Sequence, residues 1–267
     1  MSTKGSQFPD SLLRAINDWQ CGGDLNQKRK RGARLKTECA SLPAQYKTTF
    51  LVCFRQLALK PAAVWELHSN LCLAETISAW TLSTGVAREI KGGVSPDPQV
   101  PGLILEIVPP PSSIIVNLDA LYREPAFVAA HQAAKSRIRG YYDGIDKYGD
   151  TQCEVVLELD SVPMSAAYAL GGHSSDAEDI PRLLFGHNPS KAELDEFGTL
   201  LARSDQKLGP RWIVGAAKDR VLQRTLIQYG VMTAPAERSQ DTQGSATKDG
   251  GHDCSSCVSD YAWGSDT

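Results

Sequence analysis

Residues 149–159, GDTQCEVVLEL, are the stretch around which the chain is organised. A polar, turn-forming approach leads here into a strand rich in β-branched and apolar residues. Successive side chains of a strand point to opposite faces, so Gln152 and Glu154 are expected on one face, and Cys153 and Val155 on the core-facing side. An amide beside a carboxylate at the mouth of a strand makes a site-like pair, although strands that leave a loop often begin with polar residues for structural reasons alone.

The size and composition of the chain fit a globular protein. Its 267 residues, 42% of them hydrophobic, can bury a core as one large domain or as a domain with appendages. The formal net charge of −3 gives no overall preference for a polyanionic partner. Seven cysteines without framework spacing indicate reduced thiols rather than a disulfide scaffold. The sequence shows no signal-peptide pattern and no apolar run of membrane-spanning length, so we expect a cytoplasmic protein with no membrane partner.

Four regions are expected along the chain. Residues 1–45 read as an N-terminal helical and basic segment, and residues 46–165 as the core. Residues 166–233 read as a mostly helical C-terminal extension. Residues 234–267 are rich in Ser, Asp, Thr, Gln and Gly, with little to bury, and are expected to form a disordered tail.

Local patterns predict the individual elements of an α+β fold. Strands are expected over 48–57, 76–83, 103–108, 113–118 and 152–159. Helices are expected over 8–20, 84–90, 124–138, 190–201 and 213–229, a helix followed by a loop over 61–76, and a loop over 170–182. The helix that follows Ser190 carries Glu193 in the third helical position, which is the pattern of a capping box.

Two clusters outside the core have both a structural and a functional interpretation. Residues 28–36 contain six lysines and arginines, which form either a solvated helix face or a phosphate-contacting patch for nucleic acid. In the tail, His252, Cys254 and Cys257 are too few ligands for a closed zinc site, so no metal is expected.

Arg55 is unusual because it ends an otherwise apolar strand. An arginine at a strand end is usually a surface residue. On the inner face it must be paired with an anion or a buried acceptor, because burying an unpaired charge is costly.

Three short motifs occur in one order along the chain. Arg55 ends the first strand, residues 78–81 (SAWT) are followed by residues 86–87 (VA), and residues 152–154 (QCE) begin the late strand. In this order they resemble the mono-ADP-ribosyltransferase superfamily of the Arg–Ser–Glu type, over about residues 48–160. The resemblance implies an ADP-ribosyltransferase-like split β-sandwich core flanked by N- and C-terminal helices.

The resemblance also implies that the chain takes NAD as a substrate, needs no metal, and breaks the nicotinamide–ribose bond. Glu154 would stabilise the oxocarbenium-like ribose, much as carboxylates do in glycoside cleavage. Arg55 would hold the phosphates of NAD. Ser78 or Thr81 would hydrogen-bond around the nicotinamide ribose or orient Glu154, and Trp80 would pack either beside the nicotinamide or in the core.

The middle motif departs from the family pattern at its serine. Ala79 stands where the family serine is expected, and Ser78 lies one place earlier, so it points the other way on a regular strand. Either a bulge re-aims Ser78, or this serine role is absent.

Gln152 and Tyr148 bear on the acceptor of ADP-ribose. Glutamine cannot act as a base toward a guanidinium, but it can exchange hydrogen bonds with an amide-like edge. Family members with glutamine here resemble the Rho-inactivating exoenzymes, which modify asparagine, and the pierisin-like enzymes, which modify guanine in nucleic acid. Related enzymes place an aromatic residue at the position of Tyr148, where it touches the acceptor, although Tyr148 could equally close a turn. The basic run at 28–36 favours nucleic acid.

Three hypotheses follow. The first is a toxin or defence effector that transfers ADP-ribose to guanine in RNA or DNA, or to a protein side chain, with a neutralising antitoxin protein as the partner that this function class suggests. The second is NAD hydrolysis on the same fold. The third is a non-enzymatic nucleic-acid-binding α+β module. The first requires that Arg55 and Glu154 line one NAD-sized cleft.

Overall fold

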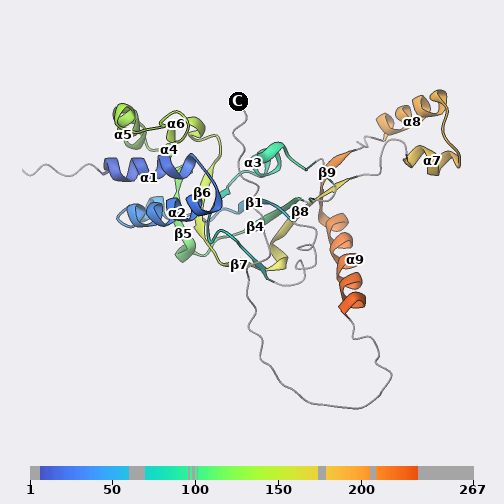
Figure 1. Cartoon of the computed structure of the whole chain (residues 1–267), viewed down its shortest axis with the longest axis horizontal. Helices are drawn as coiled ribbons and strands as arrows, with labels where there is room; N and C mark the ends of the chain where they lie inside the picture. The colour runs from blue at the N-terminus through green and yellow to red at the C-terminus, as the bar shows by residue number, and fades with distance from the viewer. Residues whose placement is uncertain are drawn as a thin grey trace, which may run out of the picture.

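The computed structural model (Figure 1) describes residues 7–59, 70–95, 97, 100, 102–173, 179–204 and 209–233. These residues form an α+β fold, which confirms the predicted fold class at this level. The tail expected at 234–267, with its histidine and cysteines, lies outside the described residues, as does most of the helix expected over 61–76.

The main sheet has seven strands in the order β5-β6-β3-β1-β4-β8-β9. Its strands are β1 Cys53–Ala58, β3 Ile77–Thr81, β4 Gly102–Ile107, β5 Ile114–Asn117, β6 Glu154–Glu158, β8 Ala167–His173 and β9 Pro210–Val214. Two short strands, β2 Leu71–Cys72 and β7 Ser161–Val162, pair separately. Every strand pair within the described ranges is antiparallel.

The main sheet is joined at its middle through one residue pair. Strand β1 meets β3 only where Phe54 lies opposite Thr81. By contrast, β1 pairs with β4 along its whole length, and β3 does so with β6. The sheet therefore consists of two halves, β5-β6-β3 and β1-β4-β8-β9. Beyond the Phe54–Thr81 pair, β1 and β3 are no longer paired with each other.

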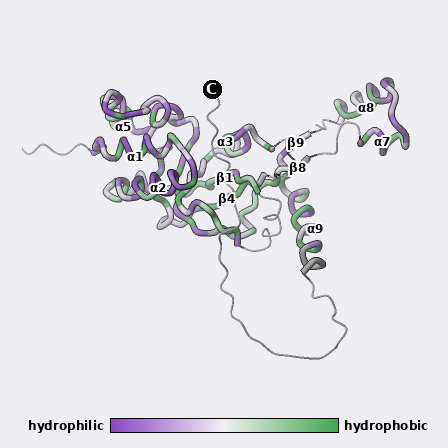
Figure 2. The backbone as a smooth tube through the Cα atoms, in the orientation of Figure 1, coloured by the Kyte–Doolittle hydropathy of each residue, from purple (hydrophilic) through white to green (hydrophobic). Residues whose placement is uncertain are grey.

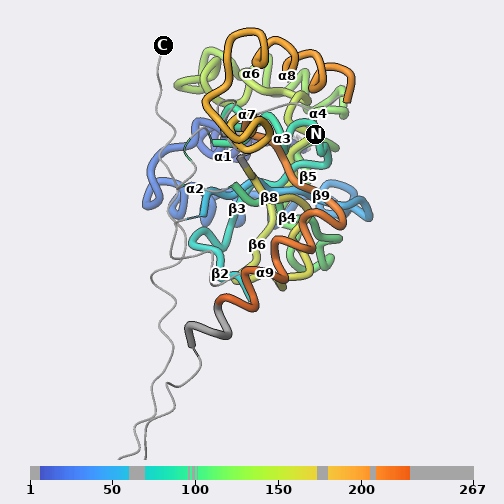
Figure 3. Tube along the Cα trace, turned by 90° about the vertical axis from the view of Figure 1, so that its right-hand side faces the viewer, coloured from blue at the N-terminus to red at the C-terminus, as the bar shows by residue number. Residues whose placement is uncertain are grey.

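Helices surround both halves. The helices are α1 Asp10–Gln20, α2 Leu25–Cys39, α3 Thr84–Glu89, α4 Leu118–Tyr122, α5 Pro125–Ala134, α6 Ile145–Tyr148, α7 Asp179–Phe185, α8 Lys191–Arg203 and α9 Gly215–Thr233. Short 3-10 turns occur at Ala44–Tyr46, Ile90–Gly92, Pro111–Ser113, Lys135–Arg137 and Met164–Ala166. Helices α7 and α8 lie beyond β8 and β9, on the opposite side of the molecule from α1 and α2 (Figure 1), and Figure 3 turns this edge toward the viewer.

Strand β6 contributes to two cores because its neighbouring residues face opposite sides of the sheet. Val156 packs into the helical layer with residues such as Leu12 and Phe127. Val155 and Leu157 pack on the other face, in a cluster that includes side chains from the short strands β2 and β7. Hydrophobic residues also run along β1 and β4 in the middle of the molecule (Figure 2). Both faces of β6 are thus buried, which holds its first residue, Glu154, in a fixed place.

The C-terminal region contributes strands as well as helices. Strands β8 and β9 extend the main sheet beyond residue 165, where the core was expected to end, and residues 170–173 are strand rather than loop. A Cβ at Gly171 would lie 2.9 Å from the backbone nitrogen of Gly102, and one at Gly172 would overlap the Ile213 side chain. The glycines that suggested a loop are therefore needed where neighbouring strands pack closely.

Other predicted boundaries differ by a few residues. The first strand begins at Cys53 rather than at residue 48, and the late strand begins at Glu154 rather than at residue 152. The last helix begins at Gly215, after a strand that occupies the start of the predicted helix. The capping box of Ser190 and Glu193 at the start of α8 is confirmed. Among the described residues, no helix has the length and apolar character needed to cross a membrane.

Gly32 sets how closely α2 can approach β3. A Cβ at this position would lie 2.9 Å from Cγ2 of Ile77 and 3.2 Å from Cζ3 of Trp19. We expect Gly32→Ala to lower the free energy of unfolding by about 1–3 kcal/mol, because the branched Ile77 side chain has little room to move. Urea denaturation measures this change.

Gly198→Ala in α8 is the matched control, since an added Cβ there meets nothing within 4 Å. The free energy of unfolding of this variant should rise by up to about 1 kcal/mol, because alanine has a higher helix propensity than glycine. Equal stabilisation of the two variants would contradict the close contact between α2 and β3.

Candidate functional site

A cavity of about 500 Å³ lies where β1 and β3 separate. Its wall includes residues of both strands next to the Phe54–Thr81 pair, together with residues from α1, α2 and the segment that leads into β6. Six of the predicted site residues line it, namely Arg55, Trp80, Thr81, Tyr148, Gln152 and Glu154. The structure thus brings together side chains from the three separate motifs.

Glu154 is the first residue of β6 and lies directly opposite Thr81 of β3. It is only 6% exposed. The indole N–H of Trp19 donates to Oε1 at 2.6 Å, and the side-chain amide of Gln20 donates to Oε2 at 3.3 Å. Burial raises the pKa of Glu154, while the hydrogen bonds from Trp19 and Gln20 act in the opposite direction. The carboxyl group is thus oriented and shielded from water, with its pKa above the ordinary value.

Arg55 lies on a charged wall of the same cavity. Its guanidinium forms an ion pair with Glu75 at 3.0 Å, and the ammonium of Lys28 contacts the other carboxylate oxygen at 3.0 Å. All three side chains are at most 15% exposed. An inner-face arginine needs an anionic partner, and Glu75 fills that requirement. Among the described residues, two cations thus contact one carboxylate here, and both carry groups that bind anions.

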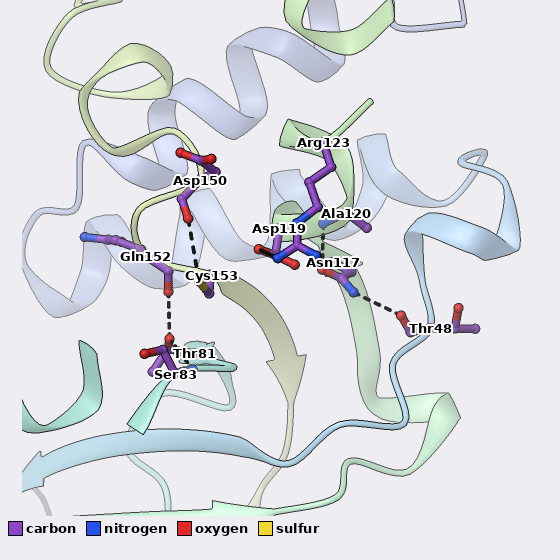
Figure 4. A network of polar contacts seen from close by, with 10 residues as sticks. All are labelled: Thr48, Thr81, Ser83, Asn117, Asp119, Ala120, Arg123, Asp150, Gln152 and Cys153. Atoms are coloured by element: carbon purple, nitrogen blue, oxygen red, sulfur yellow. Dashed lines mark hydrogen bonds and ion pairs between the residues drawn. The ribbon is translucent and has the colours of Figure 1, made fainter. Parts of the chain in front are cut away.

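A backbone turn brings Gln152 and Glu154 to the same cavity. Gln152 lies in the turn before β6, and Cys153 has a φ of +46°, in the left-handed region. Regular strand alternation therefore does not apply to these two residues. The Thr81 hydroxyl donates to the Gln152 carbonyl at 2.7 Å and accepts from the Ser83 backbone N–H at 3.1 Å (Figure 4). Thr81 thus ties the end of β3 to the turn.

Ser78 does not reach the cavity. Strands β3 and β6 pair without a register shift, so no bulge re-aims Ser78, which is fully buried. Its hydroxyl accepts a hydrogen bond from the indole N–H of Trp80 at 3.1 Å. Ala79 lines the cavity instead. The expectation that Ser78 contacts the ribose or orients Glu154 is therefore corrected, because the side chain faces the other side of the sheet.

Trp80 is 2% exposed, and its side chain belongs to the core on the β2–β7 side of the sheet. The residue also lines the cavity at its position on β3. At the rim, Tyr148 ends α6, and the ammonium of Lys147 lies 5.2 Å from the centre of its ring.

The basic run at 28–36 lies on α2 and is largely used within the chain. Lys28, Arg34 and Lys36 each form an ion pair with a carboxylate from another element, and Arg29 donates to a backbone carbonyl. These contacts support the helix-face interpretation. The side chains of Arg34 and Lys36 are nonetheless about half exposed, and exposed ion pairs are weak, so a phosphate can still replace these partners.

Among the cavity residues that were not singled out from the sequence, four make the polar contacts with Glu154 and Arg55 described above or complete their charged wall. Trp19 and Gln20 were read as part of an amphipathic helix, Lys28 as one charge in a run, and Glu75 as part of a helix or loop. One signal pointed to a residue such as Glu75. An arginine on the inner face of a strand needs an anionic partner, and this was one of the two interpretations of Arg55. Within the described ranges, no group of three or more His, Cys, Asp or Glu side chains could hold a metal ion.

Comparison of the chain with protein-family models, with curated proteins and with solved structures found no significant match. Function has to be inferred from the residues that line the cavity and from their chemistry.

The raised pKa of Glu154 has a measurable effect on stability. Burial favours the protonated carboxyl, so its contribution to folding is present below the unfolded-state pKa and is lost as pH rises through the folded-state pKa. Glu154→Gln removes this titration. The stability of the variant relative to the unmodified protein should therefore increase with pH over a range that begins at the ordinary glutamate pKa, about 4.3. Urea denaturation across this range tests the prediction, and a pH-independent difference would contradict it.

Proposed function

We propose that the chain is a mono-ADP-ribosyltransferase, which cleaves the nicotinamide–ribose bond of NAD and transfers ADP-ribose to an acceptor at the rim of the cavity. The observation that carries the proposal is the convergence of Arg55 and Glu154 on one cavity of about 500 Å³. The three motifs occur in the order that the resemblance gives, although Arg55 lies inside β1 and not at its end, where the sequence had suggested it.

The wall formed by Arg55, Lys28 and Glu75 is the proposed binding place of the NAD pyrophosphate. Its two cations attract a phosphate, and a planar guanidinium suits the geometry of phosphate oxygens. Glu75 would keep both cations in place before the ligand arrives. A preformed site of this kind lowers the ordering cost of binding.

Glu154 is the proposed stabiliser of the ribose. When the glycosidic bond breaks, the bonding electrons leave with nicotinamide and positive charge develops on the ribose. A fixed carboxylate next to that charge binds the transition state more tightly than the ground state. The small exposure of Glu154 strengthens the effect, because little water screens the interaction.

The split of the sheet also fits the proposal. Two half-sheets that separate next to Phe54 and Thr81 leave a cleft with Arg55 on one side and Glu154 on the other. An ADP-ribosyltransferase-like split β-sandwich, as implied by the resemblance, has this general arrangement. The family fold is accordingly part of the proposal.

Gln152 and Tyr148 at the rim bear on the acceptor. We propose an acceptor with an N–H beside a carbonyl, an edge that guanine shares with an asparagine side chain. Guanine in RNA or DNA remains the first candidate, and a protein side chain the alternative. An effector role as a toxin or in defence, and a neutralising antitoxin protein, are predictions from this activity.

Loss of the Glu154 carboxylate should abolish most of the activity. We expect Glu154→Ala to lower kcat for nicotinamide release by about 10²–10³-fold, the usual effect of removing one preorganised electrostatic group. Release of labelled nicotinamide from NAD measures this rate.

Glu158→Ala is the matched control, because Glu158 lies on the same strand and face but contacts Lys36 instead of the cavity. This variant should keep kcat within about twofold, as distant surface changes usually do. Equal activity of the Glu154→Ala variant and the unmodified protein would refute the proposed role of Glu154. No NAD turnover by the unmodified protein would favour the non-enzymatic binding module.

The acceptor can be identified with NAD labelled in the adenylate phosphate. We expect label in a nucleic-acid fraction that resists protease and is lost on nuclease treatment. Label that is lost with protease indicates a protein side chain. Nicotinamide release without label in either fraction indicates that water is the acceptor, which contradicts transfer but retains NAD cleavage.

A further inference from the structure

The end of helix α1 holds the Glu154 carboxylate from two sides. The indole N–H of Trp19 donates to one oxygen at 2.6 Å, and the Gln20 amide donates to the other at 3.3 Å. Both donors come from a helix more than 130 residues earlier in the chain than the carboxylate. A carboxylate has about four acceptor positions, so two remain for a ligand in the cavity.

Tyr122 of α4 fixes the Gln20 side chain in turn. Its hydroxyl lies 2.7 Å from the Gln20 side-chain oxygen and 2.6 Å from the carbonyl oxygen of Ile145. When the hydroxyl donates to the Gln20 oxygen, the NH₂ group of the amide faces Glu154. The hydroxyl has one proton for these two acceptors. In the state in which it donates to Gln20, the amide is bonded at both ends, and Tyr122 sets the direction from which Gln20 contacts the carboxylate.

The two residues that the sequence offered for orienting Glu154 make other contacts. Ser78 accepts from Trp80 on the far side of the sheet, and the Thr81 hydroxyl donates to the Gln152 carbonyl. The hydrogen bonds that orient the carboxylate come instead from outside the three motifs.

We infer that Trp19, Gln20 and Tyr122 are positioning residues that keep the Glu154 carboxylate directed into the cavity and ionised. The catalytic consequence of this arrangement rests on the proposed function. The arrangement itself rests on the distances, on the burial of Gln20 and Glu154, and on the partial burial of Trp19 and Tyr122. It gives the N-terminal helical segment a direct part in the active site.

The hydrogen bonds from Trp19 and Gln20 favour the charged form of Glu154 against the effect of burial, and the bond from Trp19 is the stronger influence. Their removal should therefore raise the pKa of Glu154 further. Tyr122 faces Glu154 from α4, and its own pKa is raised by burial and by the Glu154 charge. The charged groups along the cavity from the other elements are Lys28, Arg55, Glu75, Lys91, Asp143 and Lys147.

Three variants test the inference in the full chain. Trp19→Phe removes the indole donor, Gln20→Met keeps the length of the side chain without its amide, and Tyr122→Phe removes only the hydroxyl. Tyr46→Phe is the matched control, because this buried tyrosine of the same helical core donates to Glu124 instead. Thermal denaturation shows which variants fold. If Trp19→Phe does not fold, the Gln20→Met and Tyr122→Phe variants still test the inference.

The first measurement is the pKa of the Glu154 carboxyl, read by carbon-13 NMR and assigned by the loss of its signal in Glu154→Gln. The pKa should rise in Trp19→Phe and Gln20→Met, and stay unchanged in Tyr46→Phe. The second measurement is NAD cleavage against pH. The acid limb of kcat/KM should move to higher pH in the same two variants. At neutral pH we expect kcat to fall about tenfold in Trp19→Phe, the scale of one charge-assisted hydrogen bond, and less in Tyr122→Phe.

The outcomes separate this inference from the proposed function. An unmodified protein that cleaves NAD, with variants that keep its Glu154 pKa and its kcat, would overturn the positioning role alone. An unmodified protein that does not cleave NAD would overturn the proposed function. In that case, a raised Glu154 pKa in the variants would still support the assignment of Trp19 and Gln20 as the groups that hold the carboxylate.

Discussion

The single contact between β1 and β3 is the constraint on which the rest of the structure depends. Phe54 lies opposite Thr81, and the two strands separate on leaving this pair. Arg55 directly follows Phe54, and Glu154 lies opposite Thr81 on the next strand. A fully paired sheet would place backbone hydrogen bonds where the cavity now lies. The incomplete pairing thus creates the cavity and places its two principal charged side chains at its wall.

The helical layer offsets part of the free-energy cost of burying charged side chains at this cavity. Burying the carboxylate of Glu154 and the charges of Arg55 and Glu75 is unfavourable unless each receives partners. Helices α1 and α2 supply several of them, since Trp19 and Gln20 contact Glu154 and Lys28 contacts Glu75. A buried carboxyl with a raised pKa in a cleft is typical of functional sites rather than of ordinary cores. The buried charges that lower the stability of the fold are thus the same groups to which the proposed activity is assigned.

The sequence predicted the elements with strong local patterns. The strand over Gly102–Ile107 and the capping box at Ser190 were found because their signals are local. The Gly-rich strand β8 was missed, since its glycines serve close packing between strands that only the fold reveals. Strand alternation showed that Ser78 would point away unless a bulge occurred, and the regular register of β3 decides between those alternatives.

The candidate site was predictable only in part, because local sequence patterns show the motifs but not the long-range contacts between them. The motifs identified the residues of the cavity wall that come from β1, β3 and the approach to β6. The contacts of Trp19 and Gln20 with Glu154 span more than 130 residues of sequence and leave no local pattern. The partners of the cations on α2 are likewise set by tertiary packing, so a charge cluster alone could not show that these side chains are already paired.

The most direct measurement of the central claim is a crystal structure of the Glu154→Gln variant with NAD, since this change should slow cleavage while leaving the cavity intact. We expect intact NAD in the cavity between the two half-sheets, with its pyrophosphate against Arg55 and its nicotinamide ribose against residue 154. NAD bound elsewhere on the protein, or a cavity that stays empty at saturating NAD, would contradict the account.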